Sequence, residues 1–338
     1  MQRLTLAGRL IITALVLVAA YFGVRYFLGD KMLKPDTATA NTEISAPGST
    51  SPATEGGTAT TSDGSGTTTA TPTAFSYSAP APVNGKLKGV VELGASGFNS
   101  FIVRIDEQKN WKLEKAEFGA SLAIENMASD NDIRTGLKAY IAKMLDFGVP
   151  GRDIQFVVSS GALKAEGTQK IIKALKSLGY VVNTVTPERE GQLALRSVLP
   201  RDYADKSFVV DMGSGNTKIS WLENGTPKAL ETYGAKYFQN GTDDATVAAD
   251  VKAKAGQVPA GLRKTCFIIG GIPFELAKQT RKGKERYTVL NAADAYQLDN
   301  AKSKAGQNIY RAVQEATGCQ QFVFDWDANF TIGFLLSK

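Results

Sequence analysis

The sequence contains no histidine and only two cysteines, Cys266 and Cys319. The lack of histidine excludes a Ser-His-Asp triad, a Cys-His nucleophile pair and a zinc site with histidine ligands. Two cysteines are too few for a four-thiolate metal site or a network of disulfides. They leave open a single bridge or two separate buried thiols. Any chemistry must therefore rely on carboxylates, hydroxyls, lysines and backbone amides.

The chain also lacks a concentrated basic region. Its net charge is +6, from 39 lysines and arginines against 33 acidic residues in a total of 338 residues. A nucleic-acid-binding surface is usually marked by clustered basic residues interleaved with aromatic ones, and no such cluster is present. We therefore expect no nucleic acid partner. With 43% apolar residues, the composition is that of a globular chain long enough for two domains.

One long apolar run is present, and it lies at residues 10–28. As a helix, a run of about 19 residues rises just under 30 Å, enough to cross the hydrocarbon layer of a membrane. Arg3 and Arg9 precede the run, so a cleaved signal peptide is the alternative, but the small-residue site at Ala38 lies far beyond it. We expect residues 1–35 to be a single-pass anchor in the cell (inner) membrane. The cost of translocating two arginines favours placing the rest of the chain outside the cytoplasm.

The segment after the anchor, residues 36–84, is low in sequence complexity. It consists mostly of Ser, Thr, Pro, Gly and Ala, with almost no large apolar side chain before Phe75. Such a segment cannot bury enough apolar surface to offset the entropy of ordering it. We predict a disordered, flexible linker.

From residue 85 onward, short β-rich runs bounded by glycine alternate with apolar residues at helical spacing. A strand pair at 90–105 is followed by helical and strand patterns up to about 193, and the pattern restarts with a strand pair at 208–222. This alternation predicts an α/β protein with helices covering two mixed sheets. We place the first lobe at 85–205 and the second at 206–338.

Both strand pairs contain the same kind of turn. In each, a strand ends in a carboxylate, Glu92 or Asp211, and a turn of small residues with glycines and hydroxyls leads into the next strand. Glycines allow backbone N–H groups to approach an anion, hydroxyls add donors, and a carboxylate can hold Mg²⁺ or its waters. One such turn alone can simply be a tight hairpin. Its repetition predicts two phosphate cradles that face each other across a cleft.

The two turns, together with Ile268–Gly271, resemble the phosphate-1, phosphate-2 and late glycine motifs of the actin, sugar-kinase and heat-shock-chaperone ATPase superfamily. Within it, the sequence is most similar to the exopolyphosphatase and guanosine pentaphosphate phosphohydrolase family. The resemblance covers about residues 88–338. Four segments follow the family's order, and they are Glu92–Phe98, Val158–Lys164, Val185–Gln192 and Asp211–Lys218.

The resemblance implies two ribonuclease-H-like lobes with a cleft between them, the actin-like ATPase fold. It also implies binding or hydrolysis of polyphosphate or a phosphorylated nucleotide with Mg²⁺. It makes Glu190 the catalytic base that orients a water, Glu92 and Asp211 the metal-side acids, and Gly270 and Gly271 nucleotide-binding. The implied phosphate-binding residues are Gly94, Ser96, Gly97, Lys164, Gly213, Ser214, Gly215, Asn216 and Thr217.

The sequence departs from the family pattern at four positions. Glu92 replaces an aspartate, Lys164 stands where the family usually has arginine, and Arg189 replaces the acid before Glu190. Lys218 stands in place of an acid, which reverses a charge beside the implied Mg²⁺. These departures leave two alternatives: a membrane-tethered phosphohydrolase, or a catalytically degraded sensor or scaffold that binds a phosphorylated ligand or a protein partner.

Overall fold

The computed structural model describes residues 75–94, 97–118, 130–163 and 166–338, which belong to one compact unit. The predicted anchor, residues 1–35, and the predicted linker up to residue 74 lie outside the described residues. Across the described ranges, no helix has both the length and the apolar character needed to cross a membrane.

The first sheet has the strand order β3-β2-β1-β4-β5. Three strands form an antiparallel meander, and two more join parallel to the first of them. The central strand reads as a nearly continuous apolar run at Val90–Leu93 because both of its faces are covered. The strands are β1 (Lys86–Gly94), β2 (Gly97–Ile105), β3 (Trp111–Phe118), β4 (Ile154–Val158) and β5 (Val182–Thr184).

The second sheet has the order β10-β11-β9-β6-β7-β8 and repeats the first, with β10 added at one edge. A meander is again followed by two parallel strands. Asn224 and Gly225 both have positive φ and turn the chain between β7 and β8, as is typical of an Asn-Gly pair in a two-residue hairpin. The strands are β6 (Ser207–Met212), β7 (Asn216–Glu223), β8 (Thr226–Tyr233), β9 (Thr265–Gly270), β10 (Tyr287–Leu290) and β11 (Gln321–Asp325). The α/β fold with two similar lobes is thus confirmed.

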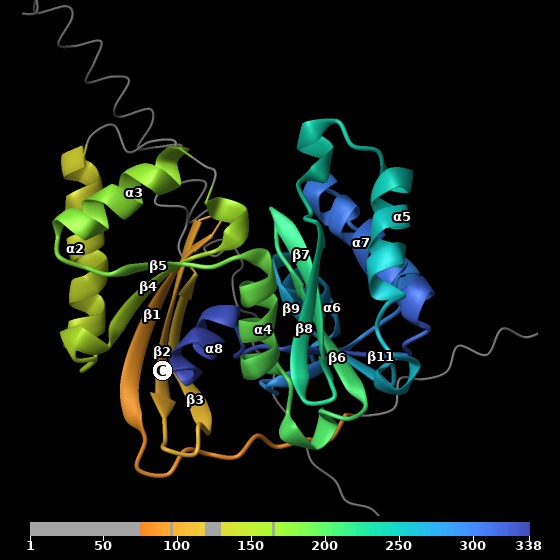
Figure 1. Cartoon of the computed structure of the whole chain (residues 1–338), viewed down its shortest axis with the longest axis horizontal. Helices are drawn as coiled ribbons and strands as arrows, with labels where there is room; N and C mark the ends of the chain where they lie inside the picture. Colours follow the sequence, from red (N-terminus) through yellow and green to blue (C-terminus); the bar gives the residue numbers. More distant parts are fainter. Residues whose placement is uncertain (1–74, 95–96, 119–129, 164–165) are drawn as a thin grey trace, which may run out of the picture. The chain divides into compact units, whose positions relative to one another are not determined.

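Helices cover both sheets and also fill the space between them (Figure 1). On the outer face of the first sheet lie α2 (Asp130–Asp146) and α3 (Glu166–Ser177). On the outer face of the second lie α5 (Asp244–Ala255), α6 (Gly271–Thr280) and α7 (Ala301–Thr317). Between the sheets lie α4 (Pro187–Val198) and α8 (Phe330–Leu336). Short 3-10 turns occur at Gly151–Asp153, Ser160–Ala162, Arg201–Tyr203, Tyr237–Asn240, Ala260–Leu262 and Ala293–Ala295.

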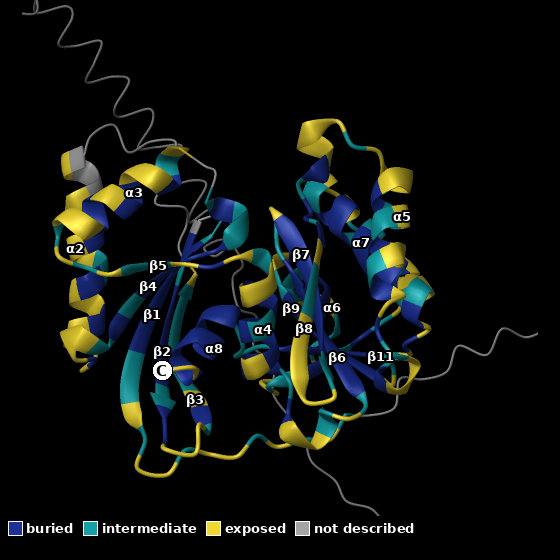
Figure 2. Cartoon of the chain, viewed as in Figure 1, coloured by how far each residue is buried: buried dark blue, intermediate teal, exposed yellow. Residues whose placement is uncertain are grey.

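The central core joins the two lobes. Leu193 of α4 packs with residues of both sheets and of α8, and most of α8 is buried (Figure 2). A Cβ atom at Gly333 would lie 1.9 Å from the carbonyl oxygen of Leu193, so α8 crosses α4 in backbone contact. Although α8 comes from the end of the chain, it also contacts β1 and β2 of the first sheet. The two lobes are therefore interlocked by α4 and α8.

The last part of the predicted linker, residues 75–84, lies against both lobes (orange in Figure 1). The ring of Phe75 is 5.6 Å from that of Phe267 in the second sheet. At the other end of the segment, the Val83 N–H donates to Asp106, directly after β2, at 3.0 Å. This segment thus spans from one sheet to the other.

The two cysteines are both buried free thiols. Cys266 lies in β9, and Cys319 lies just before β11, the neighbouring parallel strand. Of the two alternatives that the sequence leaves open, the structure has the pair of buried thiols.

Candidate functional site

A cavity of about 400 Å³ lies between the two sheets, at the carboxyl ends of β1 and β6. Most of the predicted site residues line it. They are Glu92, Gly94, Glu190, Asp211, Gly213, Ser214, Gly215, Asn216, Gly270 and Gly271. The structure therefore brings the first glycine turn, the second glycine turn and the late glycine motif to one place.

Four of the predicted phosphate-binding residues are not placed in this lining. Thr217 is fully buried in β7, and its hydroxyl has no hydrogen-bond partner among the described residues. Gly97 pairs with Gly94 across the first turn. Ser96 and Lys164 lie outside the described residues. Gly213 lines the cavity, but its N–H donates to the carbonyl of Asn216 at 3.0 Å and so closes the second turn.

The second glycine turn touches the 3-10 turn that follows β4. A Cβ atom on Gly215 would lie 3.0 Å from the Cα of Gly161. The Asn216 side-chain amide donates to the Ser160 hydroxyl at 2.9 Å and to Glu231 at 2.6 Å. Sequence reasoning selected the Val158–Lys164 segment but chose only Lys164 from it. Ser160 and Gly161 are the residues of that segment that make the contact between the lobes.

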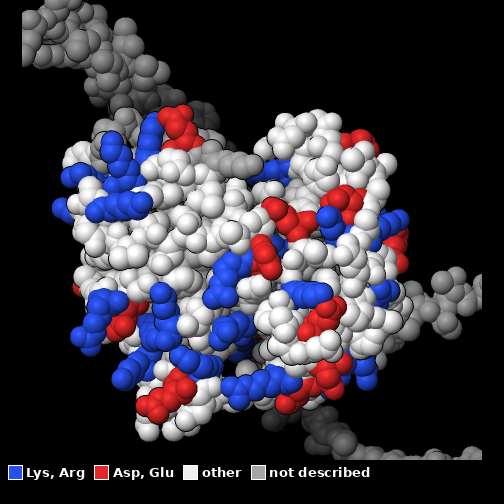
Figure 3. Space-filling model, in the orientation of Figure 1, with Lys and Arg blue, Asp and Glu red and all other residues white. Residues whose placement is uncertain are grey.

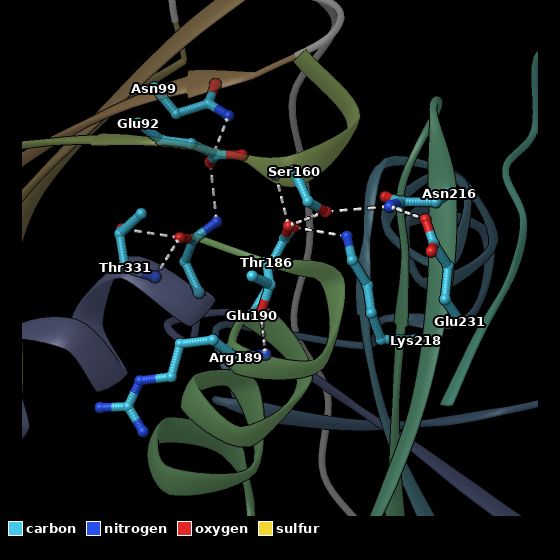
Figure 4. Close-up of polar contacts among 11 residues, drawn as sticks. Glu92, Asn99, Ser160, Thr186, Arg189, Glu190, Asn216, Lys218, Glu231 and Thr331 are labelled. Atoms are coloured by element: carbon cyan, nitrogen blue, oxygen red, sulfur yellow. Dashed lines mark hydrogen bonds and ion pairs between the residues drawn. The ribbon is translucent and has the colours of Figure 1, made fainter. Parts of the chain in front are cut away.

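Glu190 lies in the first turn of α4. The helix begins there because Thr186 caps it by accepting from the Arg189 N–H at 3.1 Å, and Pro187 follows the cap. The Glu190 side chain is buried, and both of its oxygens are engaged (Figure 4). Oε2 accepts from the Ser160 N–H at 2.8 Å and from the Ser160 hydroxyl at 2.5 Å, and Oε1 accepts from the Lys218 ammonium.

Lys218 lies on β7, directly opposite Asp211 of β6, and is 2% exposed. It reaches Glu190 because α4 packs closely on the second sheet. Gly191 makes this approach possible, since a Cβ atom there would lie 2.6 Å from the Cβ of Ala229 and 3.3 Å from that of Lys218. The charge reversal noted in the sequence is thus a buried ion pair in the structure.

The two predicted metal-side acids are held differently. Glu92 accepts hydrogen bonds from the side-chain amides of Asn99 and Asn329, each at 3.0 Å. Burial raises the pKa of Glu92, and the Asn99 amide opposes that rise. Asp211 has one oxygen that is buried without a hydrogen-bond partner among the described residues. Burial raises the pKa of Asp211 to about 7, although the nearby Lys218 charge lowers it.

These residues do not fit the predicted Mg²⁺. Magnesium takes about six oxygen ligands in near-octahedral geometry, including one or two free carboxylates. Within the described ranges, no group of three acidic or cysteine side chains is arranged to hold a metal ion. Glu190 is already paired with Lys218, and Oε2 of Glu92 accepts from two amides. What remains is one oxygen each of Asp211 and Glu92, and the Lys218 ammonium, on the residue directly opposite Asp211, repels a cation there.

One wall of the cavity is apolar and aromatic. Phe118, at the end of β3, is 63% exposed, and its ring is 6.2 Å from that of Phe274 in α6. Phe274 is in turn 5.3 Å from Trp326, which follows β11. The Arg281 guanidinium stacks over Trp326 at 3.8 Å from the ring centroid. Sequence reasoning missed this wall because its members come from elements far apart in the chain.

The N-terminus of α6 opens onto the same cavity. Gly270, its N-cap, has a φ of 113° and lies so close to β6 that a Cβ atom would be 2.2 Å from the carbonyl oxygen of Met212. In this described helix no side chain caps the first turn, and Gly270 and Gly271 both line the cavity. Backbone N–H groups at a helix N-terminus favour anions.

No family model and no curated protein matches the sequence. Solved structures do match. The Aquifex aeolicus PPX-GPPA enzyme is 17% identical, with a TM-score of 0.56 over 75% of this chain and 100% of that one. An exopolyphosphatase from Cytophaga hutchinsonii is 12% identical, with a TM-score of 0.58 over 75% of this chain and 97% of the other. The chain therefore has the two-lobed, actin-like fold of the Ppx/GppA structures, as the sequence predicts.

Proposed function

We propose that the protein is a divergent member of the exopolyphosphatase family and that it binds a phosphorylated ligand in the cavity between its sheets. This proposal rests on one observation: the first glycine turn, the second glycine turn and the uncapped N-terminus of α6 all line one cavity. Gly270 and Gly271 present the helix amides, and Lys302 adds a positive charge to the lining.

The aromatic wall supports a phosphorylated nucleotide over inorganic polyphosphate. Phe118 and Phe274 line the same cavity as the N-terminus of α6, and a planar base would stack on their rings. A long polyanion instead requires a continuous row of cations. On the face shown in Figure 3, lysine and arginine side chains gather in separate groups, with uncharged and acidic side chains between the groups.

We propose that the protein binds its phosphorylated ligand without hydrolysing it. A general base must accept a proton from the attacking water, but both oxygens of Glu190 already accept hydrogen bonds from Ser160 and Lys218. A catalytically degraded sensor therefore agrees with the geometry better than an active enzyme. Hydrolysis stays the second candidate because Glu190 does lie at the cavity, where the resemblance requires its base.

The first test measures ligand-induced stabilisation of the full-length chain in detergent. We expect GTP and GDP to raise the melting temperature, and tripolyphosphate to raise it less. Phe118→Ala should remove most of the difference between nucleotide and tripolyphosphate. Arg152→Ala, which removes an exposed side chain outside the cavity lining, is the control. If no phosphorylated compound raises the melting temperature, the cavity proposal fails and the protein-partner alternative takes its place.

The second test measures phosphate release from tripolyphosphate, GTP and guanosine pentaphosphate. We expect no release above the blank for the wild type or for Glu190→Gln. Release by the wild type that Glu190→Gln abolishes would instead establish the phosphohydrolase.

We propose further that residues 1–35 anchor the chain in the inner membrane with the folded unit outside the cytoplasm. The apolar run at 10–28 and its flanking arginines support this. Protease added to intact spheroplasts should then cut the chain within the linker. Protection in intact spheroplasts together with cleavage after lysis would place the folded unit in the cytoplasm.

A further inference from the structure

Lys218 is unusual because it is a lysine buried inside a cluster of acids. Its side chain is 2% exposed, and lysines are almost never buried to this extent without a partner. Its neighbours come from three elements. Glu190 of α4 pairs with it directly, and Asp211 of β6 lies opposite it in register. Glu92 of β1 lies near enough for the Lys218 charge to lower its pKa.

The charge balance of this cluster depends on residue 218. In the family that the sequence resembles, an acid stands at this place, so the cluster would hold four carboxylates. Four carboxylates around one cavity repel one another unless they take up protons or bind a cation. Exchange of that acid for lysine changes the charge at the position from −1 to +1. This change of two positive charge units equals the charge of one divalent cation.

The ammonium is also fixed in position. Glu190 holds it from one side, and Glu190 is itself held by the backbone and hydroxyl of Ser160 (Figure 4). The Ser160 hydroxyl in turn accepts from the amide of Asn216, which also bonds Glu231. This network ties α4, the turn after β4, and β7 together. A charge held in this way needs no reorganisation when a ligand arrives.

We propose that Lys218 supplies from within the protein the positive charge that a divalent cation supplies in related phosphate sites. The cavity therefore binds its ligand without a metal, and Glu190 is the counter-ion of Lys218. The part of this proposal that concerns ligand binding rests on the proposed function. The part that concerns metal binding does not, because it can be measured with the metal alone.

The test follows free Mn²⁺ by electron paramagnetic resonance in solutions of the full-length chain. Wild type should leave the Mn²⁺ signal unchanged. Lys218→Glu, which restores a fourth carboxylate, should bind one Mn²⁺ at least about tenfold more tightly than wild type. Adding Asp211→Asn to Lys218→Glu should abolish that binding. Lys302→Glu is the matched control, since Lys302 lines the cavity outside the acid cluster, and it should gain no binding.

Lys218→Gln is the second variant, in case Lys218→Glu does not fold. It removes the ammonium without adding an acid, and Mn²⁺ should raise its melting temperature while leaving that of wild type unchanged. Two results would overturn the proposal. One is Mn²⁺ binding by wild type that Asp211→Asn removes. The other is no gain of Mn²⁺ binding in either Lys218 variant that folds.

The ligand part is tested by GTP binding with EDTA and with Mg²⁺. Equal stabilisation of wild type in both conditions is expected, and stabilisation by GTP only with Mg²⁺ would contradict the proposal. A lack of GTP binding in both conditions would overturn the proposed function, whereas the Mn²⁺ measurements would still decide the role of Lys218.

Discussion

The ion pair of Glu190 and Lys218 is the most buried pair of opposite charges in the described residues, with each side chain no more than 3% exposed. Attraction in such a place offsets a large loss of hydration, so removing one partner leaves the other charge without compensation. At the scale of single residues, the stability of the protein should therefore depend on both members being present together.

We predict that Glu190→Gln lowers the free energy of unfolding by about 3–5 kcal/mol because it removes the carboxylate that bonds the buried Lys218 ammonium directly. The double variant Glu190→Gln with Lys218→Met should recover most of that loss. Urea denaturation measures both. Glu315→Gln is the control, since its pair with Lys252 is about half exposed and should contribute less than about 1 kcal/mol. Equal losses in the single and double variants would contradict the prediction.

Asp211 gives a prediction on pH. Its folded pKa is about 7, whereas the pKa of an unfolded aspartate is about 3.9. Between these values the folded state keeps a proton that the unfolded state has lost. The stabilising effect of this proton is complete below about pH 4 and is lost as pH rises through 7. Asp211→Asn should therefore gain stability relative to wild type as pH rises, by about 2–4 kcal/mol at pH 8.

The measurement is urea denaturation of both proteins from pH 4 to pH 8. Asp243→Ala is the control, because the Thr246 N–H lowers the pKa of the Asp243 carboxyl at the start of α5. Its folded and unfolded pKa values both lie below pH 4, so that variant should be less stable than wild type by an amount that stays nearly constant from pH 4 to pH 8. A difference between Asp211→Asn and wild type that does not change with pH would show that Asp211 is ionised throughout.

Single residues show where sequence reasoning stops. Glu190 and Asp211 were found because each sits in a short pattern of neighbouring residues. Lys218 was seen only as a reversed charge, because its partner is 28 positions away on another element. Asn99 lies directly opposite Glu92 in the hairpin of β1 and β2, whereas Asn329 belongs to no motif and reaches Glu92 only because α8 returns to the first sheet.

At the scale of elements, the position of α4 depends on one glycine. Gly191 faces β8 so closely that an added Cβ would overlap the Cβ of Ala229, which is too rigid to move aside. We predict that Gly191→Ala displaces α4 from the second sheet and lowers the free energy of unfolding by about 1–3 kcal/mol. The displacement should also weaken the contact of Glu190 with Lys218. Chemical denaturation measures the first effect.

The matched control is Gly261→Ala. A Cβ atom there would meet no atom within 4 Å, and Gly261 has no positive φ, so this variant should be neutral or slightly stabilising. If both variants lose the same stability, the close packing of α4 on β8 is not the cause.

The start of α4 was predictable, because Thr186 and Pro187 are local signals for a helix N-terminus. The elements that surround α4 were not predictable. A helix covered by one sheet shows a single apolar stripe, but α4 lies between two sheets and is buried on several sides. The same holds for α8, whose buried residues occupy its whole length. Periodicity indicates that α4 exists but not which elements pack against it, and it did not predict the helix at Phe330–Leu336.

For the whole molecule, the repeated acid–glycine turn was enough to predict two similar lobes, because both copies of the strand pattern lie within continuous stretches of sequence. The aromatic wall was not predictable. Phe118, Phe274 and Trp326 come from β3, α6 and the residue after β11, and they meet only when the two lobes pack together. The cavity is therefore a property of the packed lobes and not of either turn alone.

The segment 75–84 joins the lobes away from the cavity lining, so its contacts should contribute to the stability of the whole unit. Phe75 packs against Tyr203, Phe267 and Tyr287 with ring distances of 5.3, 5.6 and 5.5 Å. We predict that Phe75→Ala lowers the free energy of unfolding by about 1–3 kcal/mol, measured by urea denaturation. Val83→Ala is the control, since that side chain is 69% exposed and should change stability by less than about 0.5 kcal/mol. If Phe75→Ala is as neutral as Val83→Ala, the segment merely lies on the surface and does not hold the lobes together.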